Sequence, residues 1–345
     1  MAYYIKNSLV LAQPTKKGHL SEVNLFRQMM LCFKLYYGAT VVIDETHSRY
    51  VGFATTDPLT GQTIQNKTNE ISDLHIITYS PSLRVARETY LQAKVARKGD
   101  GFLSDGSFKF SGDWFQYDLL SRRPHLLRPL KKKPYHRLLC NPSFLSSAIL
   151  PSVGSYGVFY IDGNNRIDFA YQPANLLRLQ PNNTSLCQLK IDTNLSKYGT
   201  PLNIPDLQYS YDADEFEYAV IHNLIGTPLQ WRCIPVCLRN NLFWGISDRA
   251  NSSQILRETE EGLEEFETFL LNNREIFLLN HDNHDHLRHY QELNMFTDYS
   301  DLPHNGEISP REYNNQEDEL CKGTVSLVLI NTDKLVFSNF DINKN

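Results

Sequence analysis

Two apolar, β-branched runs joined by a short polar turn constrain the fold of this chain more than any other part of its sequence. The first run covers residues 70–79 and the second residues 87–98, with Ser80-Pro81-Ser82 between them. β-Branched runs on either side of a Ser-Pro-Ser turn predict a β-hairpin. We therefore expect the other elements to be organised around this hairpin.

Three polar side chains of this hairpin are predicted to lie close together. Gln92 and Lys94 are two residues apart on the second strand, so both side chains leave the same face of the sheet. Asp73 on the first strand comes within reach of that face if the strands pair. A carboxylate, an amide oxygen and an ammonium group in one place suit the binding of a metal ion and a phosphate. The alternative is an ordinary cross-strand ion pair, worth on the order of 0.2–1 kcal/mol.

The pattern of Asp73, a spacer and Gln92-Ala93-Lys94 resembles that of the PD-(D/E)xK nuclease superfamily. More narrowly, it is similar to the Mrr-type restriction endonucleases, in which Gln replaces the final acidic residue. These families also carry a Glu on the helix before the sheet, and Glu22 fits that place. The resemblance covers roughly residues 15–140.

The resemblance implies an α/β fold, with a restriction-endonuclease-like αβββαβ core and a mixed sheet, followed by an α+β C-terminal region. We expect a nuclease domain over residues 1–150. A C-terminal domain over residues 151–345 would then recognise the target, bind a partner protein or mediate oligomerisation.

The resemblance also implies a divalent metal site, with Mg²⁺ or Mn²⁺ as the cofactor. Asp73 would be the main anionic ligand, Gln92 would offer its amide oxygen or position a metal-bound water, and the Ala93 carbonyl would be a further ligand. Lys94 would orient the attacking water and offset negative charge on the phosphorane. Such a site fits phosphodiester hydrolysis, because Mg²⁺ prefers oxygen ligands, polarises the phosphate and lowers the pKa of bound water.

Gln92 stands where most of the superfamily has Glu, and this removes one negative charge from the site. Weaker metal affinity is the expected result unless another acid contributes. Glu70 precedes Asp73 by three residues and would face the other side of an ideal strand. Glu22 is therefore the preferred fourth member of the catalytic and metal-binding set. Its other explanation is structural, since the helix dipole favours a carboxylate in the first turn of a helix.

The remaining elements are expected from periodicity and turn residues. Ser21 precedes apolar residues spaced at threes and fours, and Gly38 ends that pattern, which predicts a helix between them. A polar loop is expected over residues 56–69, and residues 178–210 show no clear period. Further strands are expected at residues 39–44, 50–54 and 137–140, hairpins at 156–171 and 324–337, and helices at 114–120, 214–224 and 253–277.

The most basic segment runs from residue 122 to residue 137, and three prolines interrupt it, which predicts a loop rather than a helix. A basic loop beside a metal and phosphate site suits contacts to a nucleic-acid backbone. A solvated surface loop is the alternative. The residues expected to contact nucleic acid are Lys98, Arg122, Arg123, Arg128, Lys131, Lys132 and Lys133.

Two other groups of metal-binding residue types have less support. Residues 281–289 contain four histidines and two aspartates, which are possible Zn²⁺ ligands, but no Cys lies near them, so a solvated polar turn is favoured. Cys233 and Cys237 have a spacing that zinc sites allow, but without a second pair buried thiols are the default. The sequence also lacks the Gly-x-x-x-x-Gly-Lys-Ser/Thr motif of P-loop ATPases.

Composition agrees with a globular protein that has room for two domains, because 41% of its 345 residues are hydrophobic and 21% are charged. No apolar run is long enough to span a membrane, and the first residues lack the pattern of a secretory signal. The six scattered cysteines are expected to be reduced thiols, so we expect a cytoplasmic protein without a membrane partner. A formal net charge of −5 confines any nucleic-acid binding to local patches.

The sequence therefore favours a metal-dependent DNA endonuclease of restriction or anti-phage defence type, with the choice of DNA resting on the resemblance alone. The chain has no motor of its own, so DNA, a helicase, ATPase or sensor protein, and a second copy of the chain are the expected partners. The acidic net charge and the Gln in place of Glu support an alternative, a non-catalytic nucleic-acid- or protein-binding subunit of a defence complex. A further alternative is an RNA-cleaving toxin on the same scaffold.

Overall fold

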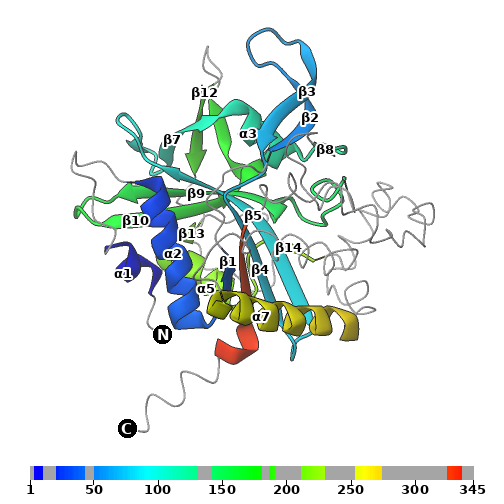
Figure 1. Cartoon of the computed structure of the whole chain (residues 1–345). Coiled ribbons are helices and arrows are strands. Elements are labelled where there is room, and N and C mark those ends of the chain that lie inside the picture. The colour runs from blue at the N-terminus through cyan, green and yellow to red at the C-terminus, as the bar shows by residue number, and fades with distance from the viewer. Residues whose placement is uncertain are drawn as a thin grey trace.

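The computed structural model describes residues 4–10, 21–42, 50–129, 142–180, 186–191, 211–229, 253–273 and 325–335. These residues form an α/β fold, in which a mixed central sheet is packed between helices and two smaller sheets (Figure 1). None of the helices in these ranges is long and apolar enough to cross a membrane.

The central sheet contains both parallel and antiparallel strand pairs. β4 pairs with β5 and β9 with β10 as antiparallel neighbours, whereas β5 runs parallel to β9 and β15 parallel to β4. The strand order is β1 (Thr40–Val42), β15 (Ser326–Asn331), β4 (Leu74–Ser80), β5 (Val85–Val95), β9 (Gly154–Ile161), β10 (Ile167–Pro173) and β13 (Tyr211–Asp212), and β14 (Thr227–Pro228) pairs with β5 off this path.

Two smaller sheets lie at the upper end of the molecule in Figure 1, and helix α7 crosses the lower end. The first consists of β2 (Tyr50–Thr56), flanked by β3 (Thr63–Glu70) and β8 (Arg128–Pro129). The second has the order β11 (Arg178–Gln180), β12 (Leu186–Ile191), β7 (Phe108–Asp113) and β6 (Gly101–Phe102).

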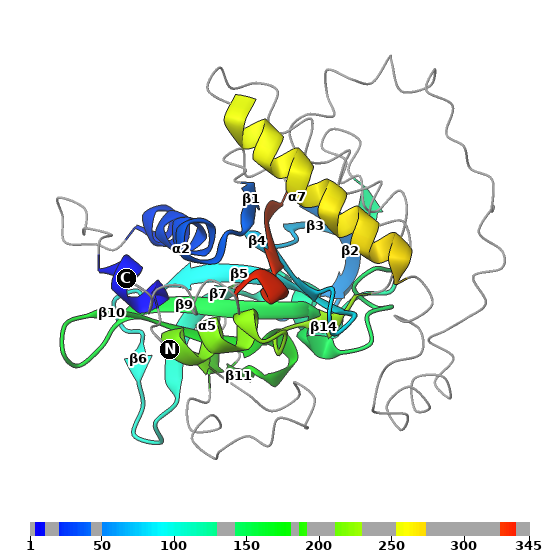
Figure 2. The same ribbon diagram turned by 90° about the horizontal axis from the view of Figure 1, so that it is seen from below.

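Helices cover both faces of the central sheet because its middle strands, β4, β5 and β9, carry buried side chains on both faces. On one face, α1 (Ile5–Leu9), α2 (Glu22–Tyr37) and α5 (Ala213–Ile221) pack against Leu74, Ile76 and Leu91. On the other face, α7 (Ser253–Asn272) packs against Ile77 and Tyr79 (Figure 2). Helix α3 (Trp114–Arg122) and the smaller sheets cover the part of that face that carries Tyr90 and Tyr156. Two short 3-10 turns, η1 (Pro151–Val153) and η2 (Ala174–Leu176), flank β9 and β10.

Local sequence patterns predicted several elements correctly. Helix α2 begins after Ser21, whose side chain accepts a hydrogen bond from the Asn24 N–H, and it ends at Gly38, which has a left-handed φ of 57°. The hairpin over residues 70–98 is confirmed as β4 and β5, and the hairpin over residues 156–171 as β9 and β10. The helices expected near residues 114, 214 and 253 are α3, α5 and α7.

Other expectations were wrong because the deciding contacts are distant in sequence. The polar segment over residues 56–69 is not a loop, since residues 63–70 form β3 against β2. The stretch without clear period contains two strands, since β11 pairs with β12 and β12 pairs with the distant β7. The closing hairpin does not form, because β15 pairs with β1 and β4, and residues 332–335 are helical. The strand expected at residues 137–140 lies outside the described residues.

The αβββαβ order is likewise more elaborate than expected, because β6 and β7 stand between β5 and α3. The central sheet also takes strands from both sides of residue 150, the expected domain boundary. β5 and β9 are direct neighbours across it, and β15 lies between β1 and β4. Residue 150 therefore does not separate two sheets.

A buried carboxylate holds the N-terminal helix to the rest of the core. Glu217 on α5 accepts hydrogen bonds from the backbone N–H groups of Tyr4 and Ile5, at 2.7–2.9 Å, and from the Tyr37 hydroxyl. Its side chain has no exposed surface. Burial raises the pKa of Glu217 to about 7, although these backbone donors favour the charged form.

We predict that replacing Glu217 with Gln removes a pH-dependent part of the stability. Because the folded-state pKa lies above the unfolded value, the native carboxyl holds its proton more tightly, and the resulting stabilisation is lost as pH rises from about 4.5 to about 7. At low pH the variant is less stable than the unmodified protein, because the amide N–H₂ of Gln would face the backbone N–H groups of Tyr4 and Ile5, which are also donors. Chemical unfolding at a series of pH values should show the difference between the two proteins narrowing over this window. A constant difference would contradict the prediction.

Candidate active site

The Asp73 carboxylate lies at the point where β4 begins and is bonded to β5. The Asp73 N–H donates to the Leu91 carbonyl, directly before the first residue pair of the two strands. Its Oδ2 accepts a hydrogen bond of 2.8 Å from the Ala93 N–H and one of 2.5 Å from Gln92 Nε2. The backbone pairing of β4 and β5 thus brings the predicted acid and amide together.

Gln92 contributes a buried oxygen to this site. Its side chain is 2% exposed, and while Nε2 donates to Asp73, Oε1 has no hydrogen-bond partner among the described residues. Tyr156 on β9 is the direct neighbour of Gln92 in the sheet, and its buried hydroxyl is also without a partner in the described part of the chain. A buried polar atom without a partner costs about 1–3 kcal/mol, so each of these two atoms is a place where a ligand or water could supply the missing hydrogen bond.

Glu22 reaches the same end of β5 from the first turn of α2. Burial raises the pKa of Glu22, and the negative charge of Asp73 raises it further. Lys94, Arg97 and the Val95 N–H act in the opposite direction, and Lys94 has the largest of these effects. Glu22 is therefore within electrostatic range of both Asp73 and Lys94. Of the predicted set, Asp73 and Gln92 are in direct contact, and Glu22 and Lys94 lie at the same end of β5.

The oxygen donors of this set match the preference of a hard divalent cation. Asp73 and Glu22 offer carboxylates, Gln92 offers a buried amide oxygen, and Ala93 offers a backbone carbonyl. The set contains only two acids. The described residues contain no group of three or more His, Cys, Asp or Glu side chains that could hold a metal, so any metal here would also need the neutral oxygens of Gln92 and Ala93. These donor types would suit a Mg²⁺ ion that retains several waters, with the Gln92 amide turned so that its oxygen rather than Nε2 faces Asp73 and the Ala93 carbonyl.

Four predicted nucleic-acid contacts fall within the described residues. Lys98 is exposed three residues beyond the end of β5, and Arg128 is exposed on β8. Arg122 is bonded to Asp118 and to the Ala54 carbonyl, and Arg123 donates to the Ala148 carbonyl. Part of the donor capacity of both Arg122 and Arg123 is therefore used within the protein. Lys131, Lys132 and Lys133 lie outside the described residues.

The sequence did not single out Arg97 or Tyr156, which both interact with the predicted set. Arg97 is three residues beyond Lys94 and lowers the pKa of Glu22. Burial raises the pKa of Tyr156, and Asp113 and Asp73 add to this effect, so the tyrosine stays protonated. The placement of Arg97 just after the Gln92-x-Lys94 motif was a usable indication. Nothing local could identify Tyr156, because only the pairing of β5 with β9 sets it opposite Gln92.

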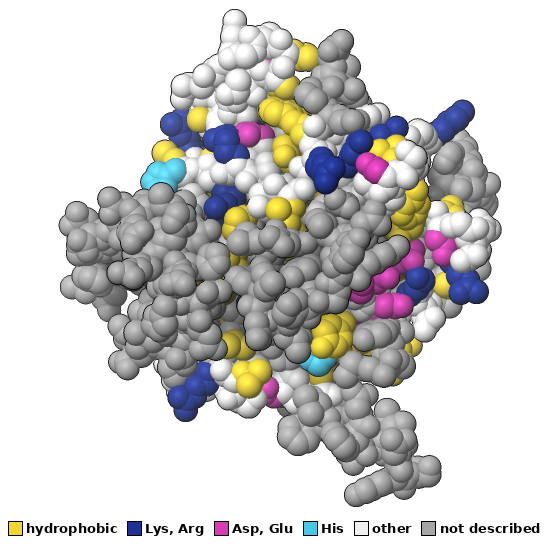
Figure 3. Space-filling view, turned by 180° about the vertical axis from the view of Figure 1, so that it is seen from behind, with side chains coloured by type: hydrophobic (Ala, Val, Ile, Leu, Met, Phe, Trp, Pro, Cys, Tyr) yellow, Lys and Arg dark blue, Asp and Glu magenta, His cyan; other side chains and the backbone are white. Residues whose placement is uncertain are grey.

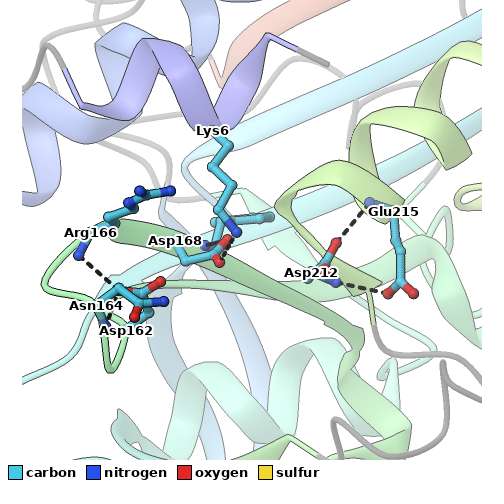
Figure 4. Close-up of polar contacts among 8 residues, drawn as sticks. Lys6, Asp162, Asn164, Arg166, Asp168, Asp212 and Glu215 are labelled. Carbon is cyan, nitrogen blue, oxygen red and sulfur yellow. Dashed lines mark hydrogen bonds and ion pairs between the residues drawn. The ribbon is translucent and has the colours of Figure 1, made fainter. Parts of the chain in front are cut away.

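A second cluster of charged residues is accounted for by local structure (Figure 4). Lys6 on α1 forms an ion pair with Asp168 on β10. Asp162 accepts hydrogen bonds from the N–H groups of Asn164 and Arg166 within the turn between β9 and β10. Asp212 and Glu215 form a capping box at the start of α5. This cluster stabilises the turn and the helix ends.

The other two groups of possible metal ligands cannot be located, because they lie outside the described residues. These groups are residues 281–289 and the pair Cys233 and Cys237. Of the six cysteines, Cys32 and Cys187 are described as buried free thiols, and burial raises the pKa of each to about 12. Both are thus held as neutral thiols, which are poor metal ligands and poor nucleophiles.

Comparison of the chain with protein-family models, with curated proteins and with solved structures gave no match. The site must therefore be interpreted from its own residues.

We predict opposite pKa changes at Glu22 when its two charged neighbours are neutralised. Lys94→Met should raise the pKa of Glu22 by removing a favourable positive charge, and Asp73→Asn should lower it by removing a repelling carboxylate. NMR titration of the Glu22 side-chain carboxyl carbon, assigned with Glu22→Gln, measures both changes. Lys34→Met at the other end of α2 is the matched control and should leave this pKa unchanged. Changes of the same sign in both variants would mean that the three groups do not converge.

Proposed function

We propose that this protein is a Mg²⁺-dependent endonuclease that hydrolyses phosphodiester bonds in DNA, and that its core is a variant of the restriction-endonuclease fold. The observation that carries this proposal is the hydrogen bonding of Asp73 to Gln92 and Ala93 at one end of β5, with Glu22 in electrostatic range of Asp73 and Lys94. The parallel pairing of β5 with β9, connected through α3, supports the fold assignment. The choice of DNA, and of a role in restriction or phage defence, follows from the resemblance to the Mrr-type enzymes.

Each residue has a role that its position allows. Asp73, Glu22 and the oxygens of Gln92 and Ala93 would hold the cation. Bound Mg²⁺ supplies charge neutralisation at the phosphate and lowers the pKa of its water. Lys94 would orient the attacking water and stabilise negative charge on the phosphorane. Tyr156 would remain a neutral hydroxyl beneath the site, because its pKa is raised well above the ordinary value.

A second candidate function is favoured by one contact. Gln92 Nε2 donates to Asp73, so the carboxylate already has an internal partner, and the amide adds no negative charge for a metal. This arrangement suits a non-catalytic subunit that retained the fold and binds nucleic acid or a protein. An RNA-cleaving enzyme with the same site is the third candidate. A helicase, ATPase or sensor protein remains a proposed partner, as does a second copy of the chain.

We predict that cleavage requires both Asp73 and Lys94. The unmodified protein should cut DNA in Mg²⁺ or Mn²⁺ and lose activity in EDTA, and Asp73→Ala and Lys94→Ala should each lower the rate at least a hundredfold, the scale of a group that acts directly in the chemical step. Gel assays with plasmid DNA, single-stranded DNA and RNA measure this. Asp57→Ala is the control, because Asp57 is an aspartate of the turn between β2 and β3 that also accepts backbone hydrogen bonds.

The three candidate functions give different results in this assay. Binding without any cleavage in the unmodified protein would support the non-catalytic subunit, and loss of RNA alone would support the RNA-cleaving enzyme.

We predict that Gln92→Glu tightens metal binding. The added carboxylate restores a negative charge next to Asp73 and should lower the Mg²⁺ concentration that gives half-maximal cleavage. In the metal-free protein the same change places two carboxylates together in a buried place, so the variant should be less stable without Mg²⁺ and regain stability when it is added. Thermal unfolding across a Mg²⁺ titration measures this second effect. An unfolding temperature that does not change with Mg²⁺ concentration in either protein would contradict a metal site here.

A further inference from the structure

The four-stranded sheet carries a row of three cations that the strand register places side by side. Arg178 on β11 is paired with Lys190 on β12, and Lys190 is paired with Lys109 on β7. The residues that alternate with them, Leu189 and Phe110, are fully buried in the core. Since successive residues of a strand point to opposite faces, the three cations share the outer face of this sheet.

This arrangement does not stabilise the sheet. Like charges placed directly opposite one another in an antiparallel pair are destabilising, and here two such pairs are adjacent. Two acids of the described residues lie near the row: Asp105 in the turn between β6 and β7, and Asp100, which accepts a hydrogen bond from Ser111. Hydrogen bonds from Ser107 lower the pKa of Asp105, and the nearby charges of Lys190 and Arg178 lower it further. Among the described residues, the three cations of the row outnumber these two acids, on a chain whose net charge is −5.

The row is connected to the candidate active site through two hydrogen bonds and one charge interaction. Ser111 follows Lys109 on the same face of β7, and its hydroxyl donates to Asp100 over 3.0 Å. The other Asp100 oxygen accepts from the Arg97 N–H over 2.7 Å. The Arg97 side chain acts in turn on Glu22. The outer face of β7 thus leads to the end of β5 where Glu22 and Lys94 lie.

The length of the row is on the scale of a short stretch of nucleic-acid backbone. Neighbouring strands are about 4.8 Å apart, so three strands place their cations over about 10 Å. Phosphates of one strand of a duplex advance about 3.4 Å each along the helix axis, so this length corresponds to about three phosphate steps. Figure 3 shows Lys and Arg side chains over the upper part of the back of the molecule, the end at which the smaller sheets lie in Figure 1.

We propose that Arg178, Lys190 and Lys109 form a binding surface for the phosphodiester backbone of the nucleic acid, and that this surface guides one strand toward the end of β5. The direction of that strand rests on the proposed function. The existence of the surface does not, because it can be tested without cleavage.

The test is equilibrium binding of a short fluorescein-labelled DNA duplex, followed by fluorescence anisotropy in EDTA at several salt concentrations. The variant Arg178→Gln/Lys190→Gln/Lys109→Gln should weaken binding by about tenfold or more at low salt, and it should reduce the salt slope by about 0.9 for each phosphate that the variant no longer neutralises. The control Arg84→Gln/Lys34→Gln/Lys334→Gln changes the net charge equally with cations outside the row. It should leave the slope unchanged.

Asp105→Asn is a variant in the opposite direction, since it keeps an acceptor for Ser107 and removes an acid whose charge interacts with Lys190 and Arg178. It should tighten binding. The triple glutamine variant of the row should unfold at the same temperature as the unmodified protein or higher, because it relieves repulsion between strands. Weak binding by this variant is therefore not explained by loss of the fold.

Two results would overturn the proposal: unchanged DNA affinity in the row variant, or an equal loss in the control. Labelled single-stranded DNA and RNA of the same sequence test whether the surface reads backbone charge alone, in which case all three probes lose affinity together. Cleavage that persists while binding ignores the row would reject this surface and leave the nuclease proposal intact. DNA binding that depends on the row, without any cleavage, would support this surface and reject the nuclease proposal.

Discussion

The pairing of β5 with both of its long neighbours is the constraint on which the rest of this structure depends. Antiparallel pairing with β4 sets Leu74 opposite Leu91, and this places the Asp73 carboxylate within reach of the Ala93 N–H. Parallel pairing with β9 sets Gln92 opposite Tyr156. A shift of either register by one residue would turn Gln92 and Lys94 to the face covered by α2 and bury the charge of Lys94 in an apolar core. The chemistry of the site is therefore fixed by backbone hydrogen bonds rather than by long side chains.

The elements that could be predicted from the sequence are those whose causes are local. Ser21 and Gly38 mark the ends of α2 because a cap and a left-handed residue act within one turn of the helix. The turn at Ser80 and the turn at Asp162 likewise select the two long hairpins. β3 was missed because its polar sequence gives no alternation, and it is a strand only because β2 offers backbone partners. β15 was recognised as a strand but assigned to the wrong neighbour, since β1 and β4 are far from it in sequence.

The same distinction holds for the candidate site. Asp73, Gln92 and Lys94 belong to one hairpin, so spacing alone brought them together. Glu22 came from the family pattern, and the position of α2 beside the end of β5 agrees with it. Tyr156 and the row on β11, β12 and β7 depend on which strands become neighbours in three dimensions. No periodicity within a single segment carries that information, because each of these strands is ordinary by itself.

The insertion of β15 between β1 and β4 has a consequence for the order of assembly. Ser80 and Asp333, which are hydrogen-bonded at the end of this strand pair, are 253 residues apart along the chain. During translation the edge of β4 stays open until this late strand leaves the ribosome, and long-range pairing of this kind is slow to form. A nascent or truncated chain would present that apolar edge to other strands. β15 is thus translated after β1, β4, β5, β9, β10 and β13, so the sheet next to Asp73 closes only once this distant segment is available to pair with β4.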